Sequence, residues 1–257
     1  MIVNTLRPNR QNAIFYIAVG ALSTWAGAVF SQNSQSNNLA QIAPFDGLDG
    51  TSLNANWKVS GLPNNKAPLS QFQGRTLDGQ AVLSLESKAS YGVLTHAWQG
   101  AAPPELSWRW RLDQALTQAD IQTKAGDDAA LKVCVMFDQP LGDIPFFQRS
   151  ALGIARAATG QNLPSATLCY LWDNRYPAGT HGANPYSGRV RYVVLNGPQA
   201  QLGQWVTQLR RVAQDFALMF GQETQVLPRI TAIAVGADSD NTHGNSLGYI
   251  ADLRWLP

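Results

Sequence analysis

Leu-Ser-Trp-Arg-Trp-Arg-Leu, residues 106–112, is the stretch that decides the fold. Side chains alternate between the two faces of a β-strand, so one face carries Trp108, Trp110 and two leucines, and the other carries Arg109 and Arg111. An apolar face of this size has to be buried against a second layer. We therefore predict a strand with both tryptophans in the core. The two arginines then lie on an opposite face, where they need water, an acid or a ligand.

Similar runs recur on both sides of this stretch and predict about nine strands. They are separated by turn signals and cover residues 81–86, 91–98, 131–137, 168–172, 189–195, 230–235 and 247–255, with an edge element near 57–59. The turn Asp78-Gly79 leads into the first of them. Many short strands with such turns predict a mainly β protein, a jelly-roll-like β-sandwich.

Two segments have helical character. Over residues 203–220, apolar side chains recur at spacings of four and three, which predicts one amphipathic helix packed on the sandwich; they are Trp205, Leu209, Val212, Phe216 and Phe220. Residues 146–158 could form a second, short helix.

The N-terminal 28 residues have the pattern of a secretory signal peptide. Arg7 and Arg10 precede a mostly apolar run over 13–30, and Ala26-Gly27-Ala28 is a small-residue cleavage site. An uncleaved membrane anchor is the alternative. The polar tract that follows predicts a disordered linker over 29–44, and one domain then covers 45–257. We expect a periplasmic or secreted protein.

Charge narrows the range of partners. Removal of residues 1–28 removes two of the 19 basic residues and no acid, which leaves 17 basic and 17 acidic residues and a net charge of zero. A neutral surface argues against nucleic acid or an anionic membrane as the main partner, so we expect no membrane contact after signal cleavage.

The two cysteines, Cys134 and Cys169, both fall inside predicted strands. In an oxidising compartment they could form a disulfide if their strands are neighbours. The alternative is a pair of buried thiols that behave as small apolar side chains.

The best candidate site is the loop that follows the strand 168–172. Trp172-Asp173-Asn174-Arg175 stands where strand meets loop, and Asn184 and Tyr186 lie further along the same loop. Acid, amide and guanidinium groups can pair with sugar hydroxyls, and Trp or Tyr can stack on a pyranose face. The alternative is structural, with Asp173 and Asn174 holding turns and Arg175 paired with an acid.

A second set of polar residues could extend that site. The predicted ligand-binding set therefore also includes Arg109, Arg111, Asp128, Asp240 and Asn241. No cofactor is expected, with calcium as the alternative, because carboxylate oxygens cluster at 127–128, Asp138, Asp238 and Asp240. Asx turns, with Asp128 or Asp240 paired to Arg109 or Arg111, would explain the same residues without a ligand.

Catalysis has little support in the sequence. The chain contains no Gly-x-Ser-x-Gly elbow, no His-Glu-x-x-His and no phosphate-binding glycine loop. A glycosidase needs two facing carboxylates, and no spacing selects such a pair. Whether the protein is an enzyme stays open.

Several motifs together resemble the DUF3047 family of secreted bacterial proteins, over about residues 45–255. They include Trp108-Arg109-Trp110-Arg111, Lys124-x-Gly126-Asp127-Asp128, Cys169-Tyr170-x-Trp172-Asp173-Asn174 and Asn184-Pro185-Tyr186. The resemblance implies a secreted single domain and supplies no activity. The early Phe-Asp and the closing strand are similar to carbohydrate-binding jelly rolls, which is an analogy of fold alone.

These observations favour a non-catalytic protein that binds carbohydrate or a cell-envelope glycan. One alternative is a polysaccharide-acting hydrolase that uses loop carboxylates such as Asp173 or Asp240. Another is an envelope assembly protein that meets its partner through the helix predicted at 203–220.

Overall fold

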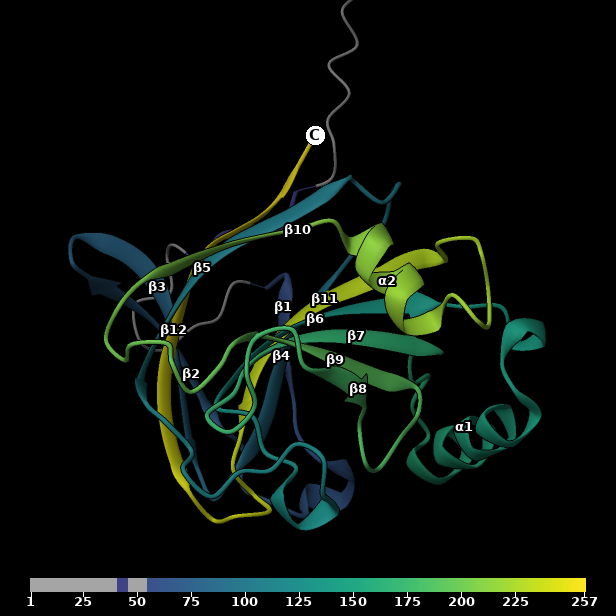
Figure 1. Ribbon diagram of the computed structural model, residues 1–257, viewed down its shortest axis with the longest axis horizontal. Coiled ribbons are helices and arrows are strands. Elements are labelled where there is room, and N and C mark those ends of the chain that lie inside the picture. Colours follow the sequence, from purple (N-terminus) through teal and green to yellow (C-terminus); the bar gives the residue numbers. More distant parts are fainter. Residues whose placement is uncertain (1–40, 46–54) are drawn as a thin grey trace, which may run out of the picture. The chain divides into compact units, whose positions relative to one another are not determined.

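The computed structural model describes residues 41–45 and 55–257 (Figure 1). The expected signal peptide, and the linker up to residue 40, lie outside the described residues. The described residues fall within one compact unit, Leu39–Pro257. Ile42 is 7% exposed, and the Trp57 indole donates to the Ala43 carbonyl at 3.1 Å. Packing therefore begins before Phe45, inside the segment expected to be linker.

The described residues form two sheets. Sheet A consists, in spatial order, of β1 (Trp57–Ser60), β4 (Tyr91–Ala97), β11 (Arg229–Asp238), β6 (Leu131–Asp138), β7 (Ala166–Trp172), β9 (Val190–Asn196) and β8 (His181–Ala183). Sheet B consists of β10 (Val206–Arg210), β5 (Glu105–Gln114), β12 (Asn245–Leu256), β3 (Gln80–Lys88) and β2 (Gln71–Leu77). Short 3-10 turns are η1 (Pro63–Asn65), η2 (Lys124–Gly126) and η3 (Leu141–Asp143).

The connections confirm the predicted jelly-roll-like β-sandwich. Successive strands from β3 to β6 alternate between the sheets, and so do β10, β11 and β12. Neighbouring strands are antiparallel except for β7 and β9, which run parallel. The predicted turn between β2 and β3 has φ values of 53° at Asp78 and 76° at Gly79, as a two-residue type I′ hairpin requires.

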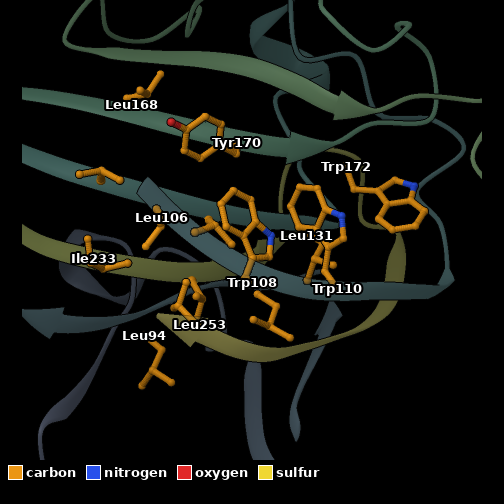
Figure 2. Packing of buried hydrophobic residues seen from close by; sticks show 14 of the residues in the cluster. Leu94, Leu106, Trp108, Trp110, Leu131, Leu168, Tyr170, Trp172, Ile233 and Leu253 are labelled. Carbon is orange, nitrogen blue, oxygen red and sulfur yellow. The ribbon is translucent and has the colours of Figure 1, made fainter. Parts of the chain in front are cut away.

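The core lies between the sheets and is rich in aromatic rings (Figure 2). Trp108 and Trp110 of β5 are both fully buried, which confirms the predicted alternation. Across the sandwich, Trp108 packs on Tyr170 of β7 with ring centroids 5.3 Å apart, and Trp110 packs on Trp172 at 5.8 Å. Rings at these distances contribute about 0.5–1.5 kcal/mol per pair beyond the area that they bury.

The outer face of sheet A is also covered. The segment between β5 and β6 crosses this face, and Ile121 and Ala129 pack there beside Leu171 and Val194. Every residue of β7 is therefore buried, which explains why its sequence is an apolar run rather than an alternation.

The same outer face contains a disulfide. Cys134 of β6 lies directly opposite Cys169 of β7 in the antiparallel register, and the two form a disulfide bond. The sequence left open a disulfide or two buried thiols, and the disulfide is the correct alternative.

The prediction of a single helix over residues 203–220 is wrong for the first half of that segment. Residues Val206–Arg210 form β10, an edge strand that pairs with β5, and only Val212–Phe220 is helical (α2). The β-branched pair Val206-Thr207 suits a strand, and the open edge of β5 supplies hydrogen-bond partners that a helix would leave unused. Phe216 and Phe220 of α2 enter the core, and the ring centroids of Phe216 and Phe137 are 4.7 Å apart.

The short helix expected at 146–158 is confirmed as α1 (Phe146–Thr159). It ends at Gly160, whose φ of 64° gives a left-handed cap. Among the described residues, no helix has the length and apolar composition needed to cross a bilayer.

Removal of the disulfide is predicted to destabilise the domain. The bridge closes a segment with a sequence separation of 35, and the loss of loop entropy in the unfolded chain corresponds to about 4 kcal/mol at most. We expect Cys134→Ala/Cys169→Ala to lower the free energy of unfolding by about 2–4 kcal/mol in urea titrations. Reduced wild type is the control and should behave like the variant. An unchanged unfolding midpoint in both samples would contradict this.

Candidate functional site

The Trp172–Arg175 motif is mainly structural. Trp172 is 1% exposed and its ring packs on Trp110, so it offers no face to a sugar. Asp173 is 4% exposed and accepts from the backbone nitrogens of Arg175 and Tyr176 at 2.7 and 2.5 Å. Asn174 donates to the Leu116 carbonyl at 2.9 Å. Burial of Trp172 therefore excludes the expected stacking on its ring, while Asp173 and Asn174 hold the turn that follows β7.

Arg175 has the acid partner that the structural alternative requires. Its guanidinium lies 3.0 Å from Asp120, whose other oxygen accepts from the Tyr176 hydroxyl at 2.7 Å. The Arg175 side chain is still 56% exposed.

Arg109 and Arg111 lie on the outer face of sheet B, as the alternation predicts, but away from the other candidates. Arg109 pairs with Asp252 at 2.6 Å and lies over the Trp205 ring, and Arg111 pairs with Asp113 at 2.6 Å. The structural alternative, in which they pair with Asp128 or Asp240, is therefore wrong as to the partners. Both guanidiniums have acid partners on their own sheet, and among the described residues neither contacts the candidate residues of the loops.

Asp128 brings two distant loops together. It is 1% exposed and lies between η2 and β6. Its two oxygens accept from the backbone nitrogens of Asn241 and Thr242 at 3.1 and 2.7 Å, and from the Thr242 hydroxyl at 2.6 Å. The carboxylate thus fixes the loop after β11 against the segment before β6.

A third loop joins this contact through Asn184 and Tyr186. The Asn184 amide donates to Asp127 at 2.6 Å, while its oxygen accepts from the backbone nitrogen of Tyr186 at 2.9 Å. The Tyr186 hydroxyl lies 2.9 Å from the Lys124 carbonyl and 3.1 Å from the Asn241 side-chain oxygen, and can donate to either. Tyr186 as a whole residue remains 59% exposed. We call these five residues, Lys124, Asp127, Asn184, Tyr186 and Asn241, the Tyr186 surface.

A buried acidic cluster lies next to this surface. One carboxylate oxygen from each of Asp128, Asp238 and Asp240 lies within 4.8 Å of the others. Asp238 accepts from the Lys132 ammonium at 2.8 Å and from the Ala129 nitrogen at 3.1 Å. One Asp240 oxygen is buried without a hydrogen-bond partner among the described residues.

Burial dominates the electrostatics of the cluster. It raises the pKa of both Asp238 and Asp240, and the other carboxylates raise them further. Burial works against the charged form of Lys132, but Asp238 and its neighbours outweigh it and raise the pKa of that ammonium. Three carboxylates against one ammonium leave a negative charge that a divalent cation could balance through oxygen ligands. Asp138, which the calcium alternative included, is not part of this arrangement, because it pairs with Arg229 at the far end of β6.

Asp127 is the carboxyl of the Tyr186 surface. Burial raises its pKa to about 6, the Asn184 hydrogen bond opposes the shift, and the nearby Asp238 adds to it. A carboxyl that titrates near neutral pH can accept or donate a proton where ordinary aspartates only accept hydrogen bonds.

Sequence reasoning did not place Asp127, Lys124 or Lys132 in the candidate site. Lys132 gave a signal, since it is a charged residue inside the apolar strand 131–137 and needs a buried acid as its partner. Asp127 was considered only as part of the acidic pair 127–128 for calcium, and Lys124 only as part of a family motif, because their places in the Tyr186 surface depend on how three loops meet.

Replacement of Asp127 should change how stability depends on pH. A carboxyl with a raised pKa in the folded state stabilises the fold while protonated, and that contribution is lost as pH rises from about 4 to 6. Asp127→Asn removes this titration and still accepts from Asn184. We expect the variant to gain about 1 kcal/mol over wild type above pH 6, and nothing near pH 4, after allowance for solvent screening.

Thermal or urea unfolding over pH 4–8 measures this difference. Asp143→Asn, which changes an exposed carboxyl in η3, is the matched control. Parallel pH profiles for wild type and Asp127→Asn would show that the Asp127 carboxyl is not perturbed.

The fold has distant counterparts among solved structures. The K1 cleaved adhesin domain of Lys-gingipain from Porphyromonas gingivalis W83 is 9% identical, with a TM-score of 0.39 over 84% of this chain and 98% of that chain. The xyloglucanase domain of NopAA, a type three effector from Sinorhizobium fredii in complex with cellobiose, is 7% identical, with a TM-score of 0.40 over 79% and 94%. Likenesses this remote carry no argument about function.

Comparison with families is more informative than comparison with individual proteins. No curated protein matches the chain. One family profile matches residues 44–254, which is most of the sequence and agrees with the resemblance seen in the motifs. The chain belongs to the family described as Protein of unknown function (DUF3047).

Proposed function

We propose that this protein is a non-catalytic β-sandwich that binds carbohydrate or a cell-envelope glycan through the Tyr186 surface. The observation that carries the proposal is the exposed Tyr186 ring, surrounded by the amide and carboxyl groups of Asn184, Asn241 and Asp127. An aromatic face and planar polar groups side by side match the two kinds of surface on a sugar ring, its C–H face and its hydroxyls.

The surface is already organised for binding. The hydroxyl of Tyr186 has two acceptors within 3.1 Å, and Lys124 lies 5.4 Å from the ring centroid. Asn184 is held by Asp127 on one side and by the backbone of Tyr186 on the other. Side chains that are ordered before binding lose less entropy when a ligand arrives, which favours affinity from a small contact area.

Two other predicted site residues, Asp128 and Asp240, lie next to this surface and do not form part of it. Asp128 anchors the loop that carries Asn241, and Asp240 lies in the acidic cluster next to it. In our proposal these two residues position the surface, and a bound sugar contacts Tyr186, Asn184 and Asp127.

We further propose that the mature protein works in the periplasm or outside the cell. The Cys134–Cys169 disulfide supports this location, because such bonds persist in oxidising compartments. The signal-like pattern of residues 1–28 points the same way. A neutral mature chain also suits an uncharged glycan better than a highly charged polymer.

The decisive experiment measures glycan binding by wild type and point variants. On a glycan array, followed by titration calorimetry with the best ligand, we expect Tyr186→Ala and Asn184→Ala each to bind at least tenfold more weakly, a loss of about 1.4 kcal/mol. Phe147→Ala, which truncates another exposed ring on α1, is the matched control and should bind as wild type does. Equal affinity in all four proteins would place the binding elsewhere, and no binding to any glycan would refute the proposal.

One observation favours hydrolysis as the second candidate function. The pKa of Asp127, about 6, is suited to a general acid. A reducing-sugar assay on the glycans that bind would separate the two functions. The binding proposal expects no turnover, whereas turnover that Asp127→Asn abolishes without loss of binding would establish a hydrolase.

A further inference from the structure

His96 of β4 holds a short segment that precedes the first strand. Residues 41–45, which we call the N-terminal segment, pack beside β1 and β4. The backbone nitrogen of Ala43 donates to Nε2 of His96 at 3.1 Å, and the Ala43 carbonyl accepts from the Trp57 indole at 3.1 Å. Both polar backbone groups of Ala43 are therefore paired with side chains of sheet A.

Apolar packing surrounds these hydrogen bonds. Ile42 and Phe45 are buried in the core, and the Phe45 and Trp57 ring centroids are 5.1 Å apart. The Trp57 ring in turn meets the His96 imidazole edge-on, with centroids 5.0 Å apart. His96 itself is only 8% exposed. The imidazole is therefore a buried polar group at the centre of the contact that keeps the N-terminal segment in place.

Only one protonation state of His96 fits this contact. An imidazole nitrogen that accepts a hydrogen bond carries a lone pair, so Nε2 is unprotonated and the neutral ring has its proton on Nδ1. Nδ1 is buried and has no hydrogen-bond partner among the described residues. In the imidazolium form both nitrogens are donors, so a proton on Nε2 would face the N–H of Ala43 and the hydrogen bond would be lost.

Among the described residues, no acid compensates a positive charge on His96. Trp57 of β1 and Ile233 of β11 lie opposite His96 on the two neighbouring strands, and the N-terminal segment contains no charged residue. The charged residue next to these positions in the chain is Lys58, which is exposed and positive. Burial lowers the pKa of His96, and a contact with the Ala97 backbone opposes the shift only in part.

We propose that His96 makes the docking of the N-terminal segment depend on pH, with the segment docked near neutral pH and released when His96 is protonated. Release replaces a buried neutral ring by a solvated imidazolium and lets the N–H of Ala43 bind water. It also uncovers the ring of Trp57 on β1, an edge strand of sheet A. The five released residues, fully extended, add at most about 17 Å to the connection between the domain and the preceding chain.

The direction of the effect follows from the lowered pKa. While the segment is docked, the pKa of His96 lies below its ordinary value of 6.5, and after release the solvated ring returns toward that value. The released form therefore binds the additional proton. Docking is fully favoured above about pH 6.5 and loses favour as pH falls below it, by up to about tenfold in the docking equilibrium per pH unit.

This proposal does not depend on glycan binding. His96 and the N-terminal segment share no residue with the Tyr186 surface, and the experiment below contains no glycan. Failure of either proposal leaves the other standing.

The test is amide hydrogen exchange followed by NMR, from about pH 7.5 down to about pH 5. Protection factors are corrected for the intrinsic effect of pH on exchange. We expect the protection factor of the Ala43 amide in wild type to fall about tenfold or more, while that of Val135 in the core strand β6 stays constant.

Two histidine variants identify the titrating group. His96→Gln places a non-titrating amide oxygen near the position of Nε2, so Ala43 should stay protected in this variant at every pH. His181→Gln, which changes an exposed histidine on β8, is the matched control and should behave as wild type. A constant Ala43 protection factor in wild type, or the same decrease in His96→Gln, would overturn the proposal. A parallel loss of Val135 protection would do so too, because it indicates global unfolding.

Two further measurements make the result decisive. Asp46, the next acid in the sequence, lies outside the described residues. Asp46→Asn should keep the wild-type pH dependence, and loss of that dependence would assign the effect to Asp46 instead. If His96→Gln fails to fold or to dock the segment, the nitrogen chemical shifts of the wild-type imidazole decide. A proton on Nδ1 at neutral pH, with a titration that coincides with the loss of Ala43 protection, supports the proposal, and a proton on Nε2 overturns it.

Discussion

The packing of Trp108 and Trp110 against Tyr170 and Trp172 is the interaction on which the structure depends. These rings join β5 of sheet B to β7 of sheet A, with centroids 5.3 and 5.8 Å apart. The Tyr170 hydroxyl donates to Asp215 of α2, which also accepts from Arg210 of β10 at 2.5 Å, so the same contact fixes the helix and the edge strand. Because the tryptophans serve the core, ligand recognition has to come from side chains beyond the strand ends.

Three polar loops meet at one end of the sandwich, where the strands that they connect bring them together. The segment before β6, the loop after β11 and the loop before β9 meet through Asp128, Asn241 and Asn184. Burying several carboxylates in this contact is costly, and Lys132 offsets only part of the cost. Such concentrations of unfavourable charge are more typical of functional sites than of structural turns, and Tyr186 is exposed beside this one.

Local patterns in the sequence predicted most of the fold, while contacts between distant loops could not be predicted. Alternation placed Trp108 and Trp110 in the core correctly, because a strand has only two faces. The spacing of Trp205 and Leu209 fits a helix, but the free edge of β5, which lies far away in the sequence, makes that segment a strand. The sequence could not decide whether a disulfide forms, because the bond requires Cys134 and Cys169 to lie opposite each other on neighbouring strands. Trp172, the last residue of the strand predicted at 168–172, was expected to bind a ligand because the sequence does not show that Trp110 of the other sheet covers its ring.

The central claim is that three loops brought together by the sandwich form one ligand-binding surface around Tyr186. Chemical-shift mapping of backbone amides during titration with a bound oligosaccharide tests it most directly. We predict shifts confined to residues 124–128, 184–187 and 240–242, the segments joined by the contacts of Asp128 and Asn184. Shifts centred on residues 172–175, or on the face of sheet B that carries Arg109 and Arg111, would contradict the claim.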